Sequence, residues 1–554
     1  MLAILLSYSL ISQTTIRVPS DLPSIQQALE EANAGDTVLV APGIFNELLN
    51  WPTGKNLNLI SETGSEETIL DGGSQGPIIN IESLPDESVL QGFTIQNGFS
   101  NIPDKVAALQ IRDAKIDLID LVIQNNNAEG LSIGSGAYLV NYDGRIESCR
   151  FLNNVNSSTR SNESTGLFIE AKNDIEIISC TFSNNQAFGS TRKVGAGITI
   201  IGTTSFLINI KGCTFNNNTA TSSVVSSGGA IFINGSPISN IIRIDSCNFT
   251  GNKAKEGGAI NLLGDTDTTI SNCNFIQNIA ASGDIVNNHG FIFLGGSTTS
   301  PLLISNCKIT QNGDENSSQL FISQSASDFD MLNCELSHNR SGLIRTFLNN
   351  SQRTLTFQNC TVAFNGGPIV IDNTKLVISE SIFWNDNIDI ESTSLSEIEV
   401  SNSINKGEFQ GVNLIVANPL FVSDDDLRLS PDSPGINAGI PSISITRDLL
   451  GNPRPQPAGT NPDLGCYELN QDVISSTSEA GILQHINIFP NPTRDKISLT
   501  KIVDEIQLYD FNGRLVQSAQ KASSVSAKDL PAGIYTIRLM INGQSITESI
   551  SIIK

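Results

Sequence analysis

The sequence predicts an all-β solenoid in which short strands wind into stacked coils. One pattern, apolar-x-apolar-x-x-Cys-x-Phe-x-x-Asn, occurs eleven times between about residues 88 and 386, and its clearest copy runs from Ile242 to Asn252. Apolar residues alternate on both sides of the Cys, which predicts two strands. In one continuous strand, the apolar residue three positions before the Cys would point to the opposite face. A corner must therefore separate the two strands.

Equivalent side chains of stacked coils are expected to form ladders at the strand spacing of about 4.8 Å. The Cys position predicts a ladder of thiols, made of Cys149, Cys180, Cys213, Cys247, Cys273, Cys307, Cys334 and Cys360. Five residues later, a ladder of amides should hydrogen-bond from coil to coil. It is made of Asn126, Asn154, Asn185, Asn218, Asn252, Asn278, Asn312, Asn339 and Asn365, with Asp386 in the last copy. We expect these Asn residues to adopt a left-handed backbone at a second corner, and we interpret the ladder as structural rather than as a cation site.

The nine Cys residues allow two interpretations. Disulfides are common in exported chains, and stacked coils bring Cα atoms within disulfide range. Ladder side chains run parallel, however, and eight of the nine share one position of the repeat, which favours buried free thiols. Cys466 lies outside the ladder. No Cys-x-x-Cys pair occurs, so a zinc site has no support.

The composition limits the choice of partners. The chain of 554 residues has 56 Asp and Glu against 32 Lys and Arg, and its net charge is −24. Such a chain repels nucleic acids and anionic membranes, and a strongly anionic glycan would need a cation or a local basic patch. We expect a monomer with no transmembrane segment.

The N-terminal region predicts an exported chain with a capped solenoid. Residues 1–13 read as a signal peptide, because their apolar core is too short to span a bilayer. Residues 14–72 predict a cap and a first rung, with a helix over residues 24–32 that has Ser24 as its N-cap. A helix across the first coil would cover the open apolar end. The order of this helix and the segment from Gly35 to Glu47 resembles the N-terminal cap of pectate-lyase-like right-handed parallel β-helix proteins.

This resemblance implies a right-handed parallel β-helix over residues 73–416. A third strand in each coil is predicted where Gly-Gly-Ala-Ile recurs, as in 227–233 and 256–262, so we expect three strands per coil and about 12–14 coils. Most extra residues fall between the Asn ladder and this Gly-rich strand. Variable loops at that edge of the rod are where function is usually carried.

Two further regions follow the solenoid. Residues 417–469 are rich in Pro and Gly, and four blocks (418–421, 427–439, 448–454 and 462–468) resemble the C-terminal region of choice-of-anchor Q bacterial surface proteins. We expect an irregular strap over the exit end, and then a linker at 470–483. Residues 484–554 alternate and contain an Asn-Gly turn at Asn512, which predicts a small β-sandwich.

Residues 484–554 resemble the type A C-terminal sorting domain of the type IX secretion system of Bacteroidetes, in particular at 488–493 and 530–539. The resemblance implies the type IX secretion machinery as a partner and outer-membrane export. It also implies removal of the domain, followed by release or anchoring at the cell surface.

Catalytic candidates are few. The clustered Asp motifs of β-helix hydrolases and the Gln and Asp motifs of the esterases do not appear in order. A lyase needs a base and a neutralising cation, for which the candidates are His338, Arg340 and Arg345. The alternative interpretation is a solvated turn at the Asn corner.

Ligand-binding candidates are aromatic or charged. Sugars usually stack on exposed Trp or Tyr, so Trp384, Tyr138 and Tyr142 are candidates, and Trp384 should point outward because it alternates with Phe383. The loop residues Arg160, Arg192, Lys193, Lys253 and Lys255 form a basic edge or are scattered solvating charges. Asp424, Asp425 and Asp426 are candidate calcium ligands, but they lack EF-hand spacing. We therefore predict no metal and no cofactor.

The sequence thus predicts a secreted or cell-surface β-helix protein with a non-catalytic role in adhesion or glycan contact at the loop edge. The alternative function is a polysaccharide lyase or glycoside hydrolase of the pectate-lyase-like fold.

Overall fold

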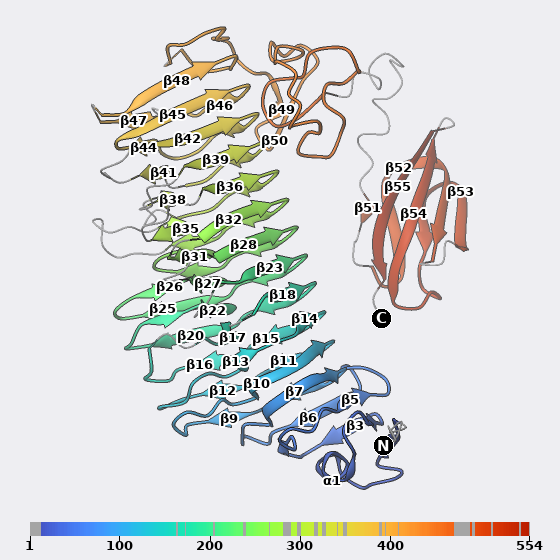
Figure 1. Ribbon diagram of the computed structural model, residues 1–554. Coiled ribbons are helices and arrows are strands. Elements are labelled where there is room, and N and C mark those ends of the chain that lie inside the picture. Colours follow the sequence, from blue (N-terminus) through green and yellow to red (C-terminus); the bar gives the residue numbers. More distant parts are fainter. Residues whose placement is uncertain are drawn as a thin grey trace, which may run out of the picture. The chain divides into compact units, whose positions relative to one another are not determined.

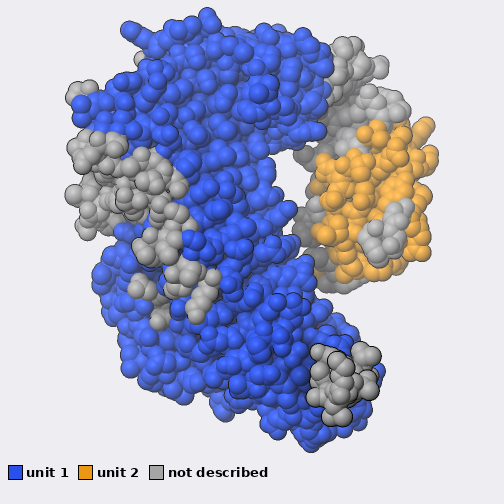
Figure 2. Space-filling model, viewed as in Figure 1, with its two compact units in different colours: residues 1–469 blue, residues 470–554 orange. Residues whose placement is uncertain are grey.

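The computed structural model describes residues 13–469 and 488–552, apart from 162–163, 172, 203–204, 236–239, 265, 281–289, 296–300, 315–318, 324–327, 341, 347–351, 387–389, 394, 408, 490–492, 511–513 and 542–543. Residues 1–12 of the predicted signal peptide and the predicted linker lie outside the described residues. The chain divides into two compact units, residues 1–469 and 470–554 (Figure 2).

The first unit is a parallel β-helix with three strands in each coil, as the repeat predicts (Figure 1). We call its three long faces face 1, face 2 and face 3. The Phe of the repeat lies in the strands of face 3, the Cys comes directly before each of these strands, and the apolar residues before the Cys lie in face 2. The Gly-rich segment leads into face 1. Faces 1 and 2 are joined by two long strands, β7 (Ile79–Gln91) and β10 (Leu109–Ile119).

Face 1 continues with β4 (Leu49–Asn50), β13 (Ala137–Tyr142), β17 (Leu167–Ala171), β22 (Ile198–Gly202), β27 (Ile231–Asn234), β31 (Ile260–Leu263), β35 (Gly290–Gly295), β38 (Gln319–Ser323), β41 (Gly342–Thr346), β44 (Ile369–Ile371) and β47 (Ile390–Ser392). Face 2 continues with β1 (Thr15–Val18), β2 (Thr37–Val40), β5 (Asn58–Ser61), β14 (Arg145–Glu147), β18 (Ile175–Ile178), β23 (Leu207–Lys211), β28 (Asn240–Asp245), β32 (Thr266–Ser271), β36 (Leu302–Ser305), β39 (Phe329–Leu332), β42 (Arg353–Gln358), β45 (Thr374–Ser379) and β48 (Glu397–Ser401).

In the described residues, face 3 is a sheet of 13 strands, which agrees with the predicted 12–14 coils. Its strands are β3 (Gly43–Phe45), β6 (Thr68–Asp71), β8 (Thr94–Gln96), β11 (Val122–Gln124), β15 (Arg150–Leu152), β19 (Thr181–Ser183), β24 (Thr214–Asn216), β29 (Asn248–Thr250), β33 (Asn274–Ile276), β37 (Lys308–Thr310), β40 (Glu335–Ser337), β43 (Thr361–Ala363) and β46 (Ile382–Trp384).

The predicted loop edge is partly a fourth parallel sheet, which we call the edge sheet. Its strands are β9 (Phe99–Ser100), β12 (Asn127–Ala128), β16 (Val155–Asn156), β20 (Gln186–Gly189), β25 (Thr219–Ser222), β30 (Lys253–Ala254) and β34 (Ile279–Ala280), and β21 (Lys193–Val194) pairs with β26 (Ser226–Ser227) beside it. The backbone in these coils continues to hydrogen-bond along the rod after the Asn corner, so the edge is more ordered than variable loops would be.

A short helix with Ser24 as its N-cap lies at the N-terminal end of the rod. Helix α1 (Ile25–Glu31) begins after Ser24, whose hydroxyl accepts a hydrogen bond from the Gln27 amide at 3.2 Å. The carboxylate of Glu47 accepts from the amides of Ile25 and Gln26 at 3.0 and 2.9 Å, which suits the positive end of the helix. The buried face of α1 includes Leu29 and joins the apolar core of the first coil.

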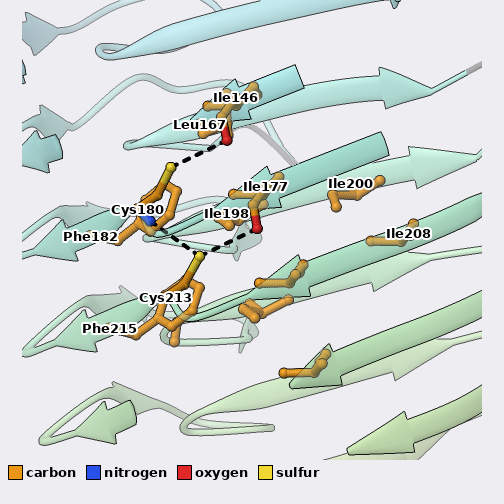
Figure 3. Packing of buried hydrophobic residues seen from close by; sticks show 14 of the residues in the cluster. Ile146, Leu167, Ile177, Cys180, Phe182, Ile198, Ile200, Ile208, Cys213 and Phe215 are labelled. Carbon is orange, nitrogen blue, oxygen red and sulfur yellow. Dashed lines mark hydrogen bonds between the residues drawn. The ribbon is translucent and has the colours of Figure 1, made fainter. Parts of the chain in front are cut away.

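Ladders of equivalent side chains run inside the rod. The Phe rings of five successive coils, from Phe151 to Phe275, stack at 4.6–5.0 Å with planes within 6° of parallel. All nine Cys residues are buried and free, and the backbone amide of Cys180 donates to the sulfur of Cys213 at 3.4 Å (Figure 3). Burial raises the pKa of Cys307 well above its usual value, so the thiol stays protonated and behaves as a small apolar group.

The ladder Asn side chains hydrogen-bond from coil to coil, but their backbone differs from the prediction. Each amide nitrogen donates to the side-chain oxygen of the next Asn at 2.8–3.1 Å. The left-handed residue is not the ladder Asn but the one before it, such as Asn125 or Asn217. The ladder side chain must point inward to reach its partners, so the preceding residue makes the corner.

The last coil also departs from the prediction, because Asn385 and not Asp386 takes the ladder position. The Asn365 side chain donates to Asn385 Oδ1 at 3.0 Å. This coil lacks the left-handed residue after its face 3 strand, so the ladder Asn comes one residue earlier than in the other coils.

The strap lies beside the last coils rather than over the exit end. Phe409 and Leu414 cover the open end of the core instead. The strap contains a short hairpin, β49 (Phe421–Ser423) with β50 (Asp426–Leu429), and its remainder follows the outer side of face 3. Its bonds to the rod include Asn333 Nδ2 to Arg447 O at 3.2 Å, Cys466 N to Thr361 Oγ1 at 3.1 Å, and the Tyr467 hydroxyl to the buried Glu335 carboxylate.

The second unit is a small antiparallel β-sandwich, as predicted. Its described strands are β51 (Ile488–Phe489), β52 (Lys496–Tyr509), β53 (Leu515–Ser526), β54 (Gly533–Ile541) and β55 (Gln544–Ile552). It has its own core, which includes Ile506 and Ile537.

Candidate functional site

Two of the three catalytic candidates line one groove on the rod. His338 and Arg340 face a groove of about 1010 Å³, which we call the corner groove. Arg345 is an exposed residue of β41 and does not line it. The structure therefore brings together His338 and Arg340, and it leaves Arg345 on face 1.

The corner groove consists of two rows of residues that follow the rod axis, one on each side of the Asn ladder. The row before the ladder Asn contains Gly251, Gln277, Gln311, His338 and Phe364, and the row after it contains Ile279, Gly313, Arg340, Gly366 and Asp386. Five coil steps separate the ends of the groove, which makes it about 24 Å long at the strand spacing.

The groove begins where the edge sheet ends. Within the described residues, β34 is the last strand of that sheet, and glycines take the equivalent position at Gly313 and Gly366 in two of the next coils. A Cβ on Gly366 would lie 2.6 Å from the carbonyl oxygen of Arg340. The close stacking of coils therefore requires glycine at Gly366, and the bare backbone of Gly313 and Gly366 forms part of the floor of the groove.

The wall of the groove is made of residues in a strained backbone. Gln277, Gln311, His338 and Phe364 have left-handed φ angles of 55–59°, which costs an L-residue roughly 1–2 kcal/mol. In earlier coils this corner is occupied by Asn125, Asn153, Asn184 and Asn217, which tolerate this conformation better. Bulky side chains at strained positions are typical of functional sites.

Neighbouring wall residues contact one another. The Gln277 amide donates to Gln311 Oε1 at 3.2 Å, and the ring of His338 lies 5.3 Å from that of Phe364, tilted by 32°. One half of the wall therefore offers amide groups, and the other half offers aromatic surface.

The charges of the groove nearly balance. Arg340 is exposed, and Asp314 and Asp386 bring two carboxylates. The carboxylate of Asp386 forms an ion pair with Lys406 at 3.0 Å. The groove therefore differs from the strongly acidic chain as a whole, and it suits an uncharged polar ligand. The sequence motif did not single out Asp314, Phe364, Gln277 or Gln311. Phe364 and the two Gln residues nevertheless share one position of the repeat, directly before the ladder Asn.

The three aromatic candidates differ in how far their rings are accessible to a ligand. Tyr142 is fully buried, and its hydroxyl donates to Arg145 O at 3.0 Å, so a sugar could not stack on it. The ring of Tyr138 stacks on Phe168 of the next coil at 4.4 Å, and Arg112 of the previous coil lies over it at 5.5 Å. Both faces of Tyr138 are therefore covered.

Trp384 points outward from β46, as predicted, but it is half-buried. It packs against the strap clusters around Leu427 and Leu464, and Lys406 Nζ lies 5.1 Å from its ring. The prediction of an outward Trp did not include the strap, which covers part of this ring.

The candidate calcium ligands Asp424, Asp425 and Asp426 do not form a cluster around one point in the structure. Asp424 and Asp425 are exposed, whereas Asp426 is paired with Arg428. The Arg428 guanidinium lowers the pKa of Asp426. Across the part of the chain that the structure describes, three or more His, Cys, Asp or Glu side chains are nowhere grouped as metal ligands.

The basic edge is partly structural. Arg160 forms an ion pair with Asp104. Lys193 is fully buried, and its ammonium donates to the carbonyl oxygens of Ser158 and Arg160 at 2.6 and 3.1 Å. Lys255 donates to Val224 O at 3.1 Å. These cations hold loops together, so they supply less free positive charge than the sequence suggests.

Two family models match the chain. Residues 258–424 match the right handed beta helix region, which together with the stacked parallel coils defines the first unit as a right-handed parallel β-helix. Residues 487–554 match the secretion system C-terminal sorting domain.

The chain therefore carries a type IX sorting domain, which marks it for export and for secretion or cell-surface attachment through the type IX machinery. The resemblances to right-handed parallel β-helix proteins and to the sorting domain are confirmed, whereas the choice-of-anchor Q resemblance stays a prediction. No curated protein matches the chain. In the described ranges, none of the helices has the length and apolar character needed to cross a membrane.

Proposed function

We propose that this protein is a secreted or surface-attached glycan-binding protein that acts in adhesion and holds an uncharged polysaccharide along the corner groove. The observation that carries this proposal is the groove itself, in which amide, aromatic and balanced charged side chains follow one another along about five coil steps. Amides suit the hydroxyl groups of sugars, and aromatic surface suits their apolar faces.

An extended peptide fits the groove less well than a glycan. The backbone amides of Gly313, Arg340 and Gly366 already donate to carbonyl oxygens of the previous coil at 2.9, 2.9 and 2.7 Å. A peptide strand that binds by strand addition needs a free backbone edge. Recognition in this groove therefore depends on side chains.

Glycan binding can be tested on the purified full chain with an array of neutral, acidic and amino-substituted polysaccharides. We expect binding to a neutral polymer, weakened about five- to thirtyfold in Gln311→Ala and in His338→Ala, since sugar contacts of this kind are worth about 1–2 kcal/mol. Arg345→Ala serves as the control, because Arg345 lies outside the groove. Equal binding by all variants, or no binding to any polymer, would overturn the proposal.

A second candidate function is cleavage of the bound polymer. The observation that favours it is the presence of a base, His338, and a cation, Arg340, in the same groove as Asp314 and Asp386. Cleavage would appear in the same assay as new reducing ends or unsaturated products, and it would be lost in His338→Gln. Binding without either product favours the adhesive role.

A further inference from the structure

The strap reaches the corner groove through a row of aromatic rings. Phe421, in the first strand of the strap hairpin, packs against Phe364 with ring centroids 6.1 Å apart and planes at 64°. Phe364 in turn packs against His338 at 5.3 Å. Phe364 and His338 line the groove, whereas Phe421 does not.

Phe364 has contacts on both sides. It also packs at the margin of the cluster formed by Ala363, Leu427, Cys466 and Tyr467, in which three of the four residues belong to the strap. Its left-handed backbone, with φ of 57°, disfavours a bulky side chain. The strap contacts therefore help to keep this ring in the groove wall.

The corner residues differ between coils with and without the strap. Where face 3 is free of the strap, the corner position holds exposed Asn residues such as Asn153, Asn184 and Asn217. The aromatic corner residues, His338 and Phe364, follow strands β40 and β43, which the strap contacts through Glu335 and Thr361. The aromatic half of the wall thus coincides with the docked strap.

We propose that Phe421 is a positioning residue for the corner groove, and that the docked strap sets the aromatic half of the wall by holding Phe364 against His338. The consequence for ligand affinity rests on the proposed function, whereas the consequence for the geometry of the wall does not. The strap is accordingly a part of the binding site and not only a cover for face 3.

The proposal can be tested in the full chain with Phe421→Ala, in which the ring contact is lost, and Phe421→Tyr, in which it is kept. Val422→Ala is the matched control, because Val422 is the next residue and is 55% exposed. The first measurement is the NMR signal of the His338 imidazole, assigned by its absence in His338→Gln. The ring current of Phe364 makes this signal sensitive to the position of that ring.

We expect the His338 signal to shift in Phe421→Ala and to stay in place in Phe421→Tyr and in Val422→Ala. Affinity for the glycan identified on the array should fall about three- to tenfold in Phe421→Ala, as for the loss of one aromatic contact, and should return in Phe421→Tyr. A His338 signal in Phe421→Ala that matches the Val422→Ala control would overturn the proposal.

Phe364→Asn provides a second route if Phe421→Ala unfolds the strap. Asn fits this corner in other coils, so the variant should fold and yet lose the ring that connects the strap to the groove. Adding Phe421→Ala to Phe364→Asn should then leave the His338 signal unchanged, because the two changes act through one contact. A further shift of the signal in the double variant would contradict the proposal.

These measurements separate the two proposals. A His338 signal that shifts in Phe421→Ala, in a protein that binds no polymer on the array, supports the positioning role and overturns the glycan proposal. Glycan binding that depends on Gln311 but not on Phe421, together with a His338 signal that does not shift, supports the glycan proposal and overturns the positioning role.

Discussion

At the scale of residues, each coil is held by a few buried polar atoms that must all find partners. The side chain of Asn252 accepts from the backbone amide and the side chain of Asn218, both at 3.0 Å, and donates to Phe215 O at 2.8 Å. Buried polar groups without partners are costly. The Asn ladder therefore fixes which residues stack on one another.

We expect Asn252→Ala to destabilise the rod by about 3–5 kcal/mol, because the backbone amide and the side chain of Asn218 and the carbonyl of Phe215 each lose a buried hydrogen bond. Chemical unfolding followed by circular dichroism measures this change. Thr250→Ala is the control, since Thr250 lies on the outer side of β29, and it should change stability by less than about 1 kcal/mol. Similar values for both variants would contradict the structural role of the ladder.

The corner residues of the groove wall, in contrast to the ladder Asn, adopt a strained backbone that lowers the stability of the rod. We expect Phe364→Asn to leave the free energy of unfolding unchanged or to raise it by up to about 1 kcal/mol, since relief of the left-handed strain offsets the lost ring contacts. Thermal unfolding of this variant beside Phe357→Ala, in which a buried ring of the core is removed, gives the comparison. A loss as large as that of Phe357→Ala would show that Phe364 is mainly a stabilising residue.

At the scale of elements, the strap is organised around buried charges rather than regular strands. The carboxylate of Glu468 lies 3.1 Å from Arg454 Nε, with both side chains buried, and it accepts from the amides of Gln456 and Asp463. Burial, together with the nearby Asp463 charge, raises the pKa of Glu468 to about 7. Burial also raises the pKa of Asp463.

Because the pKa of Glu468 in the folded strap lies above its value in an unfolded chain, folding is favoured while this group is protonated. That contribution is lost as the pH rises from about 4.5 through about 7, and at most about 3 kcal/mol is involved. We expect the strap to loosen between about pH 4.5 and about pH 7, as measured by the fluorescence of Trp384, which packs against it. The pH dependence should be weaker in Glu468→Gln and unchanged in Asp432→Asn, in which an exposed strap carboxyl is replaced. A strap that tightens above pH 7 would contradict this assignment.

At the scale of the whole molecule, the two units differ in net charge, and each has an apolar core of its own. Residues 470–554 contain eight Lys and Arg and eight Asp and Glu, so the net charge of −24 belongs to residues 1–469. Each unit also has its own apolar core. A charge of this size keeps an exported rod soluble and unattractive to anionic polymers.

We expect a chain that ends at Leu469 to unfold at the same temperature, within about 2 °C, as the β-helix of the full chain, because each unit has an apolar core of its own. Differential scanning calorimetry of both chains gives the comparison. A drop of more than about 5 °C would show that the sorting unit stabilises the rod.

The sequence by itself determined the coils, the ladders and the export domain. Short-range alternation and a repeated Cys and Asn leave few ways to bury the apolar residues, so the thiol and amide ladders could be predicted residue by residue. Alternation and a turn signal in 484–554 likewise predicted a small β-sandwich, and the resemblance of this segment to known sorting domains supplied its role in export. Local patterns suffice where each coil repeats the contacts of its neighbour.

Only the tertiary structure decided where function can reside. The corner groove depends on the end of the edge sheet at β34, and Tyr142 is buried while His338 and Arg340 share one groove. Phe421 meets Phe364 although 57 residues separate them in the chain. Such contacts arise from the path of an irregular strap along face 3, and no local period encodes that path.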